Sequence, residues 1–136
     1  MKLHSTYMGL SLNSPIIVSS CSLSENVENI VKMEDNGVGA VVMSSLFEEQ
    51  IRMEEEKLKG VIAETSYAFP EALDYFPGID DFNVGVDEYL ENIRKAKEKT
   101  KIPIIGSLNG ITTEGWIDYS KWIEQAGADA LEVNIF

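Results

Sequence analysis

The chain has 136 residues, of which 44% are hydrophobic and 25% are charged, enough for one globular domain with its own core. Its formal net charge of −12 argues against binding to nucleic acid or to an anionic membrane surface. A single cysteine excludes an internal disulfide framework, and with one histidine in no ligand spacing we expect no metal site. The chain shows neither a secretory signal nor an apolar stretch that could span a membrane, so we expect a cytoplasmic protein.

The first predicted element is a small β-hairpin over residues 6–14, where β-forming residues flank Gly9. A short apolar run over residues 15–18 follows and ends at Ser19 and Ser20. We predict that this run is the first strand of the main sheet.

An amphipathic helix is predicted next, over residues 25–36. Ser24 is its expected N-cap, because a serine side chain can accept from the unpaired amides of the first turn. Gly37 is its expected C-terminal stop, because glycine adopts the left-handed conformation that ends many helices. Val27 and Ile30 give the helix an apolar side.

Two further units repeat this order of strand and helix. Strands are predicted over residues 39–43, 102–105 and 130–135, and helices over residues 87–100 and 114–126. The second strand ends at Ser44 and Ser45. Short continuous apolar runs are typical of strands buried on both faces of a parallel sheet, and alternation with helices indicates right-handed βα crossovers.

The stretch over residues 46–86 is long for a connection between a strand and a helix. Residues 48–91 hold 13 acidic and 3 basic side chains, which is most of the net charge of the chain. Its first part, 47–58, is predicted to be a short charged helix, and its second part, 67–78, is aromatic and rich in turn residues. The acidic run is typical of a solvated face, whereas an aromatic loop after a strand is a place where such folds bind ligands.

The predicted fold is therefore α/β, with four parallel βα units after an N-terminal hairpin. A closed (β/α)8 barrel, the TIM barrel, needs eight such units and typically ~250 residues. The chain is then either a small open sheet or the first half of a barrel.

Five segments resemble the dihydroorotate dehydrogenase family. They are TYMGL (6–10), NSPIIVSS (13–20), GVGAVVMSSLFEEQI (37–51), EALDYF (71–76) and AGADALEVN (126–134). Their order and spacing together make the resemblance specific, and it runs over almost the whole chain.

The resemblance implies a (β/α)8 barrel that binds FMN at the carboxyl ends of its strands, with residues 1–136 as its incomplete N-terminal half. It implies hydride exchange between the flavin and dihydroorotate or a related dihydropyrimidine, a step of pyrimidine biosynthesis. In the family the proton-accepting residue and the phosphate-binding loops lie past the position of Phe136. We therefore assign no catalytic residue and expect this chain alone to be inactive.

By position, the resemblance also implies which side chains face the flavin: Ser19, Ser20, Ser44, Ser45, Asn109 and Asn134. Ser44 stands where the family typically has a lysine, and Asn134 matches an asparagine that touches flavin and substrate. The structural alternative is that the serines are strand-end turn residues and that Asn134 makes an internal hydrogen bond.

Two other functions are compatible with the sequence. The chain could be a complete four-stranded module that binds a small molecule or protein through its acidic and aromatic segment. It could also be a half-barrel that pairs with a second copy or another half, because unpaired strand edges favour association. We expect a small-molecule substrate and a homo-oligomer.

Overall fold

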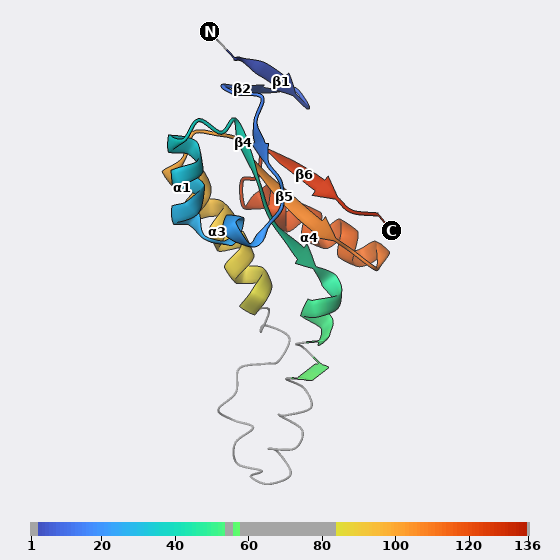
Figure 1. The fold of residues 1–136 in the computed structure, drawn as a ribbon. Helices are drawn as coiled ribbons and strands as arrows, with labels where there is room; N and C mark the ends of the chain where they lie inside the picture. The colour runs from blue at the N-terminus through green and yellow to red at the C-terminus, as the bar shows by residue number, and fades with distance from the viewer. Residues whose placement is uncertain (1–2, 54–55, 58–83, 136) are drawn as a thin grey trace, which may run out of the picture.

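The computed structural model describes residues 3–53, 56–57 and 84–135 (Figure 1). The strands are β1 (Ser5–Tyr7), β2 (Leu10–Leu12), β3 (Ile17–Val18), β4 (Ala40–Phe47), β5 (Ile104–Asn109) and β6 (Ala130–Val133). The helices are the 3₁₀ turn η1 (Ser22–Glu25), α1 (Val27–Asp35), α3 (Val84–Lys99) and α4 (Thr113–Gln125), and residues 48–53 are also helical. The aromatic segment 67–78 lies outside the described residues.

Strands β3 to β6 form one parallel sheet in the order β3-β4-β5-β6, so each strand lies beside its neighbour in the sequence. Strands β1 and β2 form a separate antiparallel hairpin. The predicted α/β fold, with four parallel strands after an N-terminal hairpin, is confirmed, and it is consistent with half of a (β/α)8 barrel.

The hairpin turns at Met8 and Gly9, whose φ angles of 51° and 77° suit the tight two-residue turns that match strand twist. It lies beyond the end of the sheet from which β4 starts (Figure 1). Its Leu12 is buried and packs against Ala40, Val42 and Ile105. The hairpin therefore covers one end of one sheet face.

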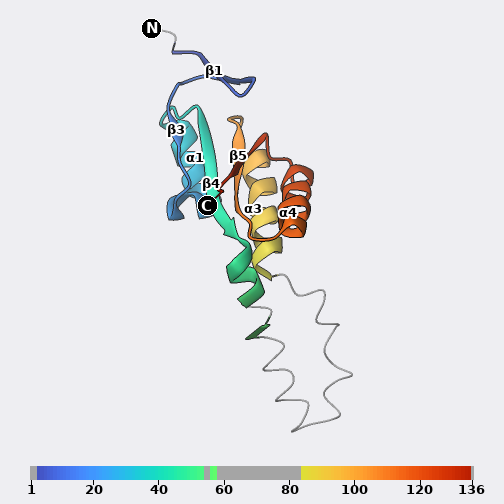
Figure 2. The same cartoon turned by 90° about the vertical axis from the view of Figure 1, so that its right-hand side faces the viewer.

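The main core lies between the other face of the sheet and the helices, and α3 and α4 lie next to each other there (Figure 2). Its fully buried side chains include Ile30, Val41, Ile93, Ile104 and Ile123. Burying a side chain of this size contributes about 1.5–3 kcal/mol, so this layer is the main source of stability. The two faces thus differ, because the helices cover one and the small Leu12 cluster occupies the other.

Strand β4 is longer than predicted because it contains an irregularity. Its pairing with β5 shifts register between Val42 and Ser45, so that β4 has one extra residue there. The predicted strand end at residue 43 was therefore wrong, since β4 continues to Phe47. The charged helix that follows starts at Glu48.

The predicted N-cap of the first helix was also wrong. The Ser24 hydroxyl donates to the carbonyl oxygen of Cys21, 2.8 Å away, within η1. Asn26 caps α1 instead, and its Oδ1 accepts from the amide of Glu28 at 2.8 Å. The predicted helix stop is confirmed, because Gly37 has a φ of +87°.

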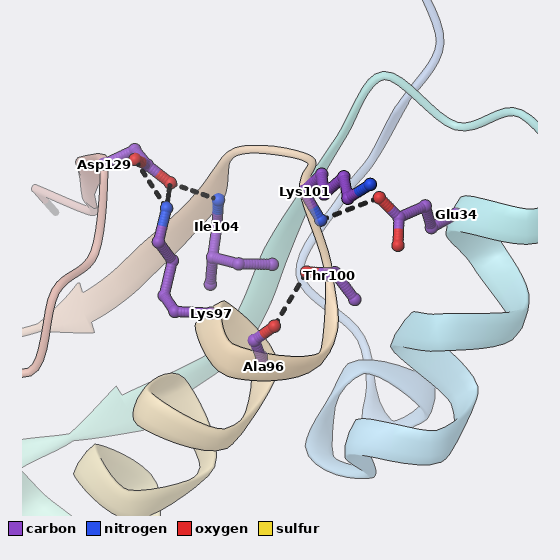
Figure 3. A network of polar contacts seen from close by, with 7 residues as sticks. All are labelled: Glu34, Ala96, Lys97, Thr100, Lys101, Ile104 and Asp129. Atoms are coloured by element: carbon purple, nitrogen blue, oxygen red, sulfur yellow. Dashed lines mark hydrogen bonds and ion pairs between the residues drawn. The ribbon is translucent and has the colours of Figure 1, made fainter.

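Polar contacts join the helices to the amino ends of the strands (Figure 3). Asp129, before β6, accepts from Lys97 Nζ at 2.7 Å and, through Oδ2, from the amide of Ile104 at 2.8 Å. Glu34 of α1 accepts from the amide of Lys101 at 2.8 Å. These contacts fix the connection between α3 and β5 from both sides.

Within the part of the chain that the structure describes, no helix is long and apolar enough to cross a bilayer.

Candidate functional site

Three serine side chains form a continuous row across neighbouring strands. Ser20 follows β3, Ser45 lies in β4 and Ser107 lies in β5. The Oγ atoms of Ser20 and Ser45 are 3.1 Å apart, and those of Ser45 and Ser107 are 2.7 Å apart. Ser45 and Ser107 are also partners in the parallel register, so the sheet itself sets the spacing. We call these three residues the serine chain.

The serine chain continues to the fourth strand. Ser107 Oγ donates to Glu132 Oε1 at 2.9 Å, and Asn134 Nδ2 donates to Ser107 Oγ at 3.4 Å. Glu132 lies in β6. Asn134 follows this strand, and its backbone N–H donates to the carbonyl oxygen of Leu108. One hydrogen-bonded row therefore crosses all four strands near their carboxyl ends.

The row lies on the sheet face opposite the helices. Side chains along a strand alternate between faces, so Ser107 shares the face of Ile105, two residues before it. Ile105 belongs to the Leu12 cluster, not to the core under the helices. By the same alternation Glu132 shares the face of Ala130, which packs against that cluster. In a barrel this face is the interior.

Tyr89 of α3 holds the backbone of the central serine from the helix side. Its hydroxyl accepts from the amide of Ser107 at 2.9 Å and donates to the Ser107 carbonyl oxygen at 3.3 Å. Burial raises the pKa of Tyr89 to about 12, helped by the negative charge of Glu132 and opposed by the bond from the Ser107 amide. The phenol is therefore neutral near pH 7, as a group that both donates and accepts must be.

Asn109 ends β5 and carries an unpaired acceptor. Its Oδ1 is buried and has no hydrogen-bond partner among the described residues. Alternation places Asn109 on the same face as Ser107. Buried polar atoms in folded proteins are nearly always paired, so this oxygen is a candidate acceptor for a group outside the described residues.

The structure brings together three of the residues proposed from the sequence, Ser20, Ser45 and Asn134. Ser19 is exposed and lies outside this hydrogen-bonded row. Ser44, at the register shift of β4, lines a hollow beside α3 together with Ser45 and Glu88. The flavin-facing roles of all six residues, Asn109 included, stay predictions.

Two members of the row, Ser107 and Glu132, were not among the sequence-based candidates. Ser107 had a signal, because it follows the predicted strand over residues 102–105 closely, as the two serine pairs follow theirs. Glu132 had one too, since it is a charged residue inside an apolar run. A charged side chain in an otherwise apolar strand needs a hydrogen-bond partner, and Ser107 is that partner for Glu132.

A buried carboxylate, that of Glu48, fixes the loop beside the row. Glu48 is 2% exposed and accepts from the amides of Ile111 and Thr112, at 2.6 and 2.9 Å, and from the Thr112 hydroxyl. Burial raises the pKa of Glu48, but these bonds and the nearby Arg52 charge outweigh it and hold the pKa below 4.5. A Cβ on Gly115 would lie 2.4 Å from this carboxylate, so only glycine fits there.

The row is made of neutral hydroxyl and amide groups with one carboxylate at its end. Such groups suit a polar, largely uncharged ligand that is recognised by hydrogen bonds. Among the described residues, no group of three or more His, Cys, Asp or Glu side chains is arranged to hold a metal ion.

Comparison with known proteins identifies relatives of one kind. The chain is 31% identical over 133 residues to the dihydroorotate dehydrogenase B (NAD(+)), catalytic subunit, of Thermoplasma acidophilum, covering 98% of this chain and 41% of that protein. The proteins of the same name from Thermoplasma volcanium and Methanocaldococcus jannaschii are 29% and 25% identical, with 96% and 93% of this chain and 40% and 39% of those proteins covered. No family model matches.

The resemblance to dihydroorotate dehydrogenases is thereby confirmed. It extends over almost the whole chain, which spans about two fifths of the length of these relatives.

Proposed function

We propose that the chain supplies four strands of an FMN-dependent oxidoreductase of the dihydroorotate dehydrogenase type, acting on dihydroorotate or a related dihydropyrimidine in pyrimidine biosynthesis. The relatives support the oxidoreductase class, since all three are named as dihydroorotate dehydrogenases. The serine chain carries the proposal, because ligands of parallel α/β folds bind at the carboxyl ends of the strands.

The residues present fit a flavin. Asn109 Oδ1 is a buried acceptor that needs a donor, and the flavin ring carries an imide N–H. Ser20, Ser45, Asn109 and Asn134 would hold the ring and a substrate lying on it. When bound, FMN supplies the redox chemistry, while these side chains bind and orient.

One substitution bears on how the flavin is tuned. Ser44 replaces the lysine typical of the family, and it lines the hollow beside α3. A serine cannot supply positive charge to a reduced flavin, so we propose that the protein reduces FMN more slowly than lysine-bearing relatives do.

We propose, too, that the outer edges of β3 and β6 are closed by further βα units, by a second copy of this chain, or by both. In the described residues each of these strands pairs on one side only, and an open edge favours pairing. Light scattering at micromolar concentration measures the oligomeric state, where a clean monomer mass would contradict a homo-oligomer.

The test is to purify the protein expressed from its complete reading frame and record its visible spectrum. We expect a yellow protein that releases FMN on denaturation, identified by chromatography against an FMN standard. It should oxidise dihydroorotate or 5,6-dihydrouracil with an artificial electron acceptor. A colourless protein that takes up no added FMN would contradict the proposal.

A further inference from the structure

The direction of donation along the serine chain follows from counting its protons. A serine hydroxyl has one proton and two lone pairs, whereas a carboxylate can only accept. Ser107 therefore gives its proton to Glu132, as the 2.9 Å contact requires. Its two lone pairs then accept from Asn134 Nδ2 and from the Ser45 hydroxyl, at 3.4 and 2.7 Å.

The same assignment of protons applies to Ser45 and Ser20. Because the Ser45 proton points to Ser107, Ser45 Oγ must accept the proton of Ser20, 3.1 Å away. Ser20 then has no proton left to offer, and neither of its lone pairs accepts from a described residue. Among the same residues, one lone pair of Ser45 has no donor either. Each hydroxyl is oriented by the next, back to the carboxylate.

The side chain of Asn109 also presents a hydrogen-bond acceptor. Asn109 Oδ1, on the same sheet face, is a buried acceptor without a partner among the described residues. The free positions of Ser20, Ser45 and Asn109 Oδ1 are therefore all acceptors. A wall of this kind favours a ligand edge that carries donors and disfavours one that carries only carbonyl oxygens.

We propose that Glu132 is a positioning residue that fixes the direction of the serine chain, and that the site consequently selects a ring with amide or imide N–H groups facing β3 to β5. The proposal rests on the proposed function for the identity of the ring. Both FMN and a dihydropyrimidine carry such an N–H, so they share the required chemistry.

Neutron diffraction from deuterated crystals tests the direction without any ligand. We expect deuterium on Ser107 Oγ pointing to Glu132, on Ser45 Oγ pointing to Ser107, and on Ser20 Oγ pointing to Ser45. A reversed deuterium at any of the three would overturn the proposal. This measurement stands even if the protein binds no FMN, which would contradict only the proposed function.

Ligand binding tests the selectivity and separates the two sources of the N–H. The first arm compares FMN with 3-methyl-FMN, and the second compares dihydrouracil with its N-methylated forms. We expect the methylated probe to bind about tenfold more weakly in one arm, which identifies the ring that faces the row. Equal binding in both arms would overturn the proposal.

Variants then connect the selectivity to the carboxylate. Glu132→Leu removes the acceptor, lets the hydroxyls turn and should reduce the preference for the unmethylated probe to what Asn109 Oδ1 alone provides. Glu132→Gln keeps an acceptor oxygen and should restore it, and Glu98→Leu on the exposed face of α3 is the matched control. A merely structural role for Glu132 would weaken both probes equally and leave their ratio unchanged, which would count against the proposal.

Discussion

The two ends of the parallel sheet use similar polar side chains for different purposes. At the amino ends, Asp129 and Glu34 are each paired with groups of the protein, including the amides of Ile104 and Lys101 (Figure 3). At the carboxyl ends, the proposed direction of the serine chain leaves the acceptor positions of Ser20 without a partner among the described residues, and Asn109 Oδ1 has none there either. A polar group that is hydrogen-bonded within the protein stabilises the fold, whereas a group of the row that lacks a protein partner is available to bind a ligand.

Glu48 is an exception to this difference between the two ends, because it stabilises the fold although it lies near the carboxyl ends of the strands. Replacing Glu48 by alanine should lower the free energy of unfolding by about 3 kcal/mol, because the amides of Ile111 and Thr112 and the Thr112 hydroxyl lose a charged acceptor. Urea unfolding measures the change. Glu49→Ala is the control, since its side chain is exposed, and an equal loss in both variants would contradict the account.

Gly115 sharpens the same prediction. Gly115→Ala should destabilise the protein in the presence of Glu48, because the added Cβ would lie 2.4 Å from the carboxylate. In the Glu48→Ala background the clash is gone, and alanine should gain up to about 1 kcal/mol from its helix propensity. Two equal penalties would show that the close contact is unimportant.

Glu48 should also make the stability of the protein depend on pH in the acidic range. The pKa of Glu48 lies below 4.5 in the folded protein, so its ionised form stabilises the fold. This contribution is fully present above pH 4.5 and is lost as the pH falls through the folded pKa. The unfolding free energy of Glu48→Gln, measured from pH 7 downward, should fall less steeply than that of the parent. Parallel curves would argue against this role.

Tyr89→Phe should cost about 2 kcal/mol, because the buried amide and carbonyl of Ser107 both lose their partner. The exposed Tyr7 offers a matched control as Tyr7→Phe. Thermal and urea unfolding should separate the two variants, and equal stabilities would show that solvent replaces the Tyr89 hydroxyl.

Ser45→Ala should have the least effect on stability, below about 1 kcal/mol, since Ser45 is only partly buried and its described hydrogen-bond partners are the hydroxyls of Ser20 and Ser107. Its effect should fall on ligand binding instead. A loss of stability larger than that of Tyr89→Phe would place Ser45 with the stabilising residues.

Much of the fold could be predicted from local signals. Short apolar runs indicated the strands, and Gly37 and Gly9 marked a helix end and a turn. The extra residue of β4 could not be predicted, because a register shift depends on the partner strand. That shift lies directly before Ser45, which joins the serine chain, whereas Ser44 makes no bond to that chain among the described residues although both line the hollow beside α3.

The site was only partly predictable for a similar reason. Position in the resemblance pointed to Ser20, Ser45 and Asn134, which the structure places in one row. Ser107 and Glu132 complete that row through contacts between strands, and pairing of this kind is set by the sheet, not by sequence spacing.

Whether the carboxyl ends of the strands bind the ligand is tested most directly by the FMN affinity of two variants, one changed at each end of the sheet. The dissociation constant, from quenching of flavin fluorescence, should rise about tenfold in Ser45→Ala and stay unchanged in Asp129→Ala. Asp129→Ala should nevertheless lose more stability, about 1.5 kcal/mol, with its partly exposed ion pair and the Ile104 bond. Unchanged affinity in Ser45→Ala, or a loss confined to Asp129→Ala, would contradict the account.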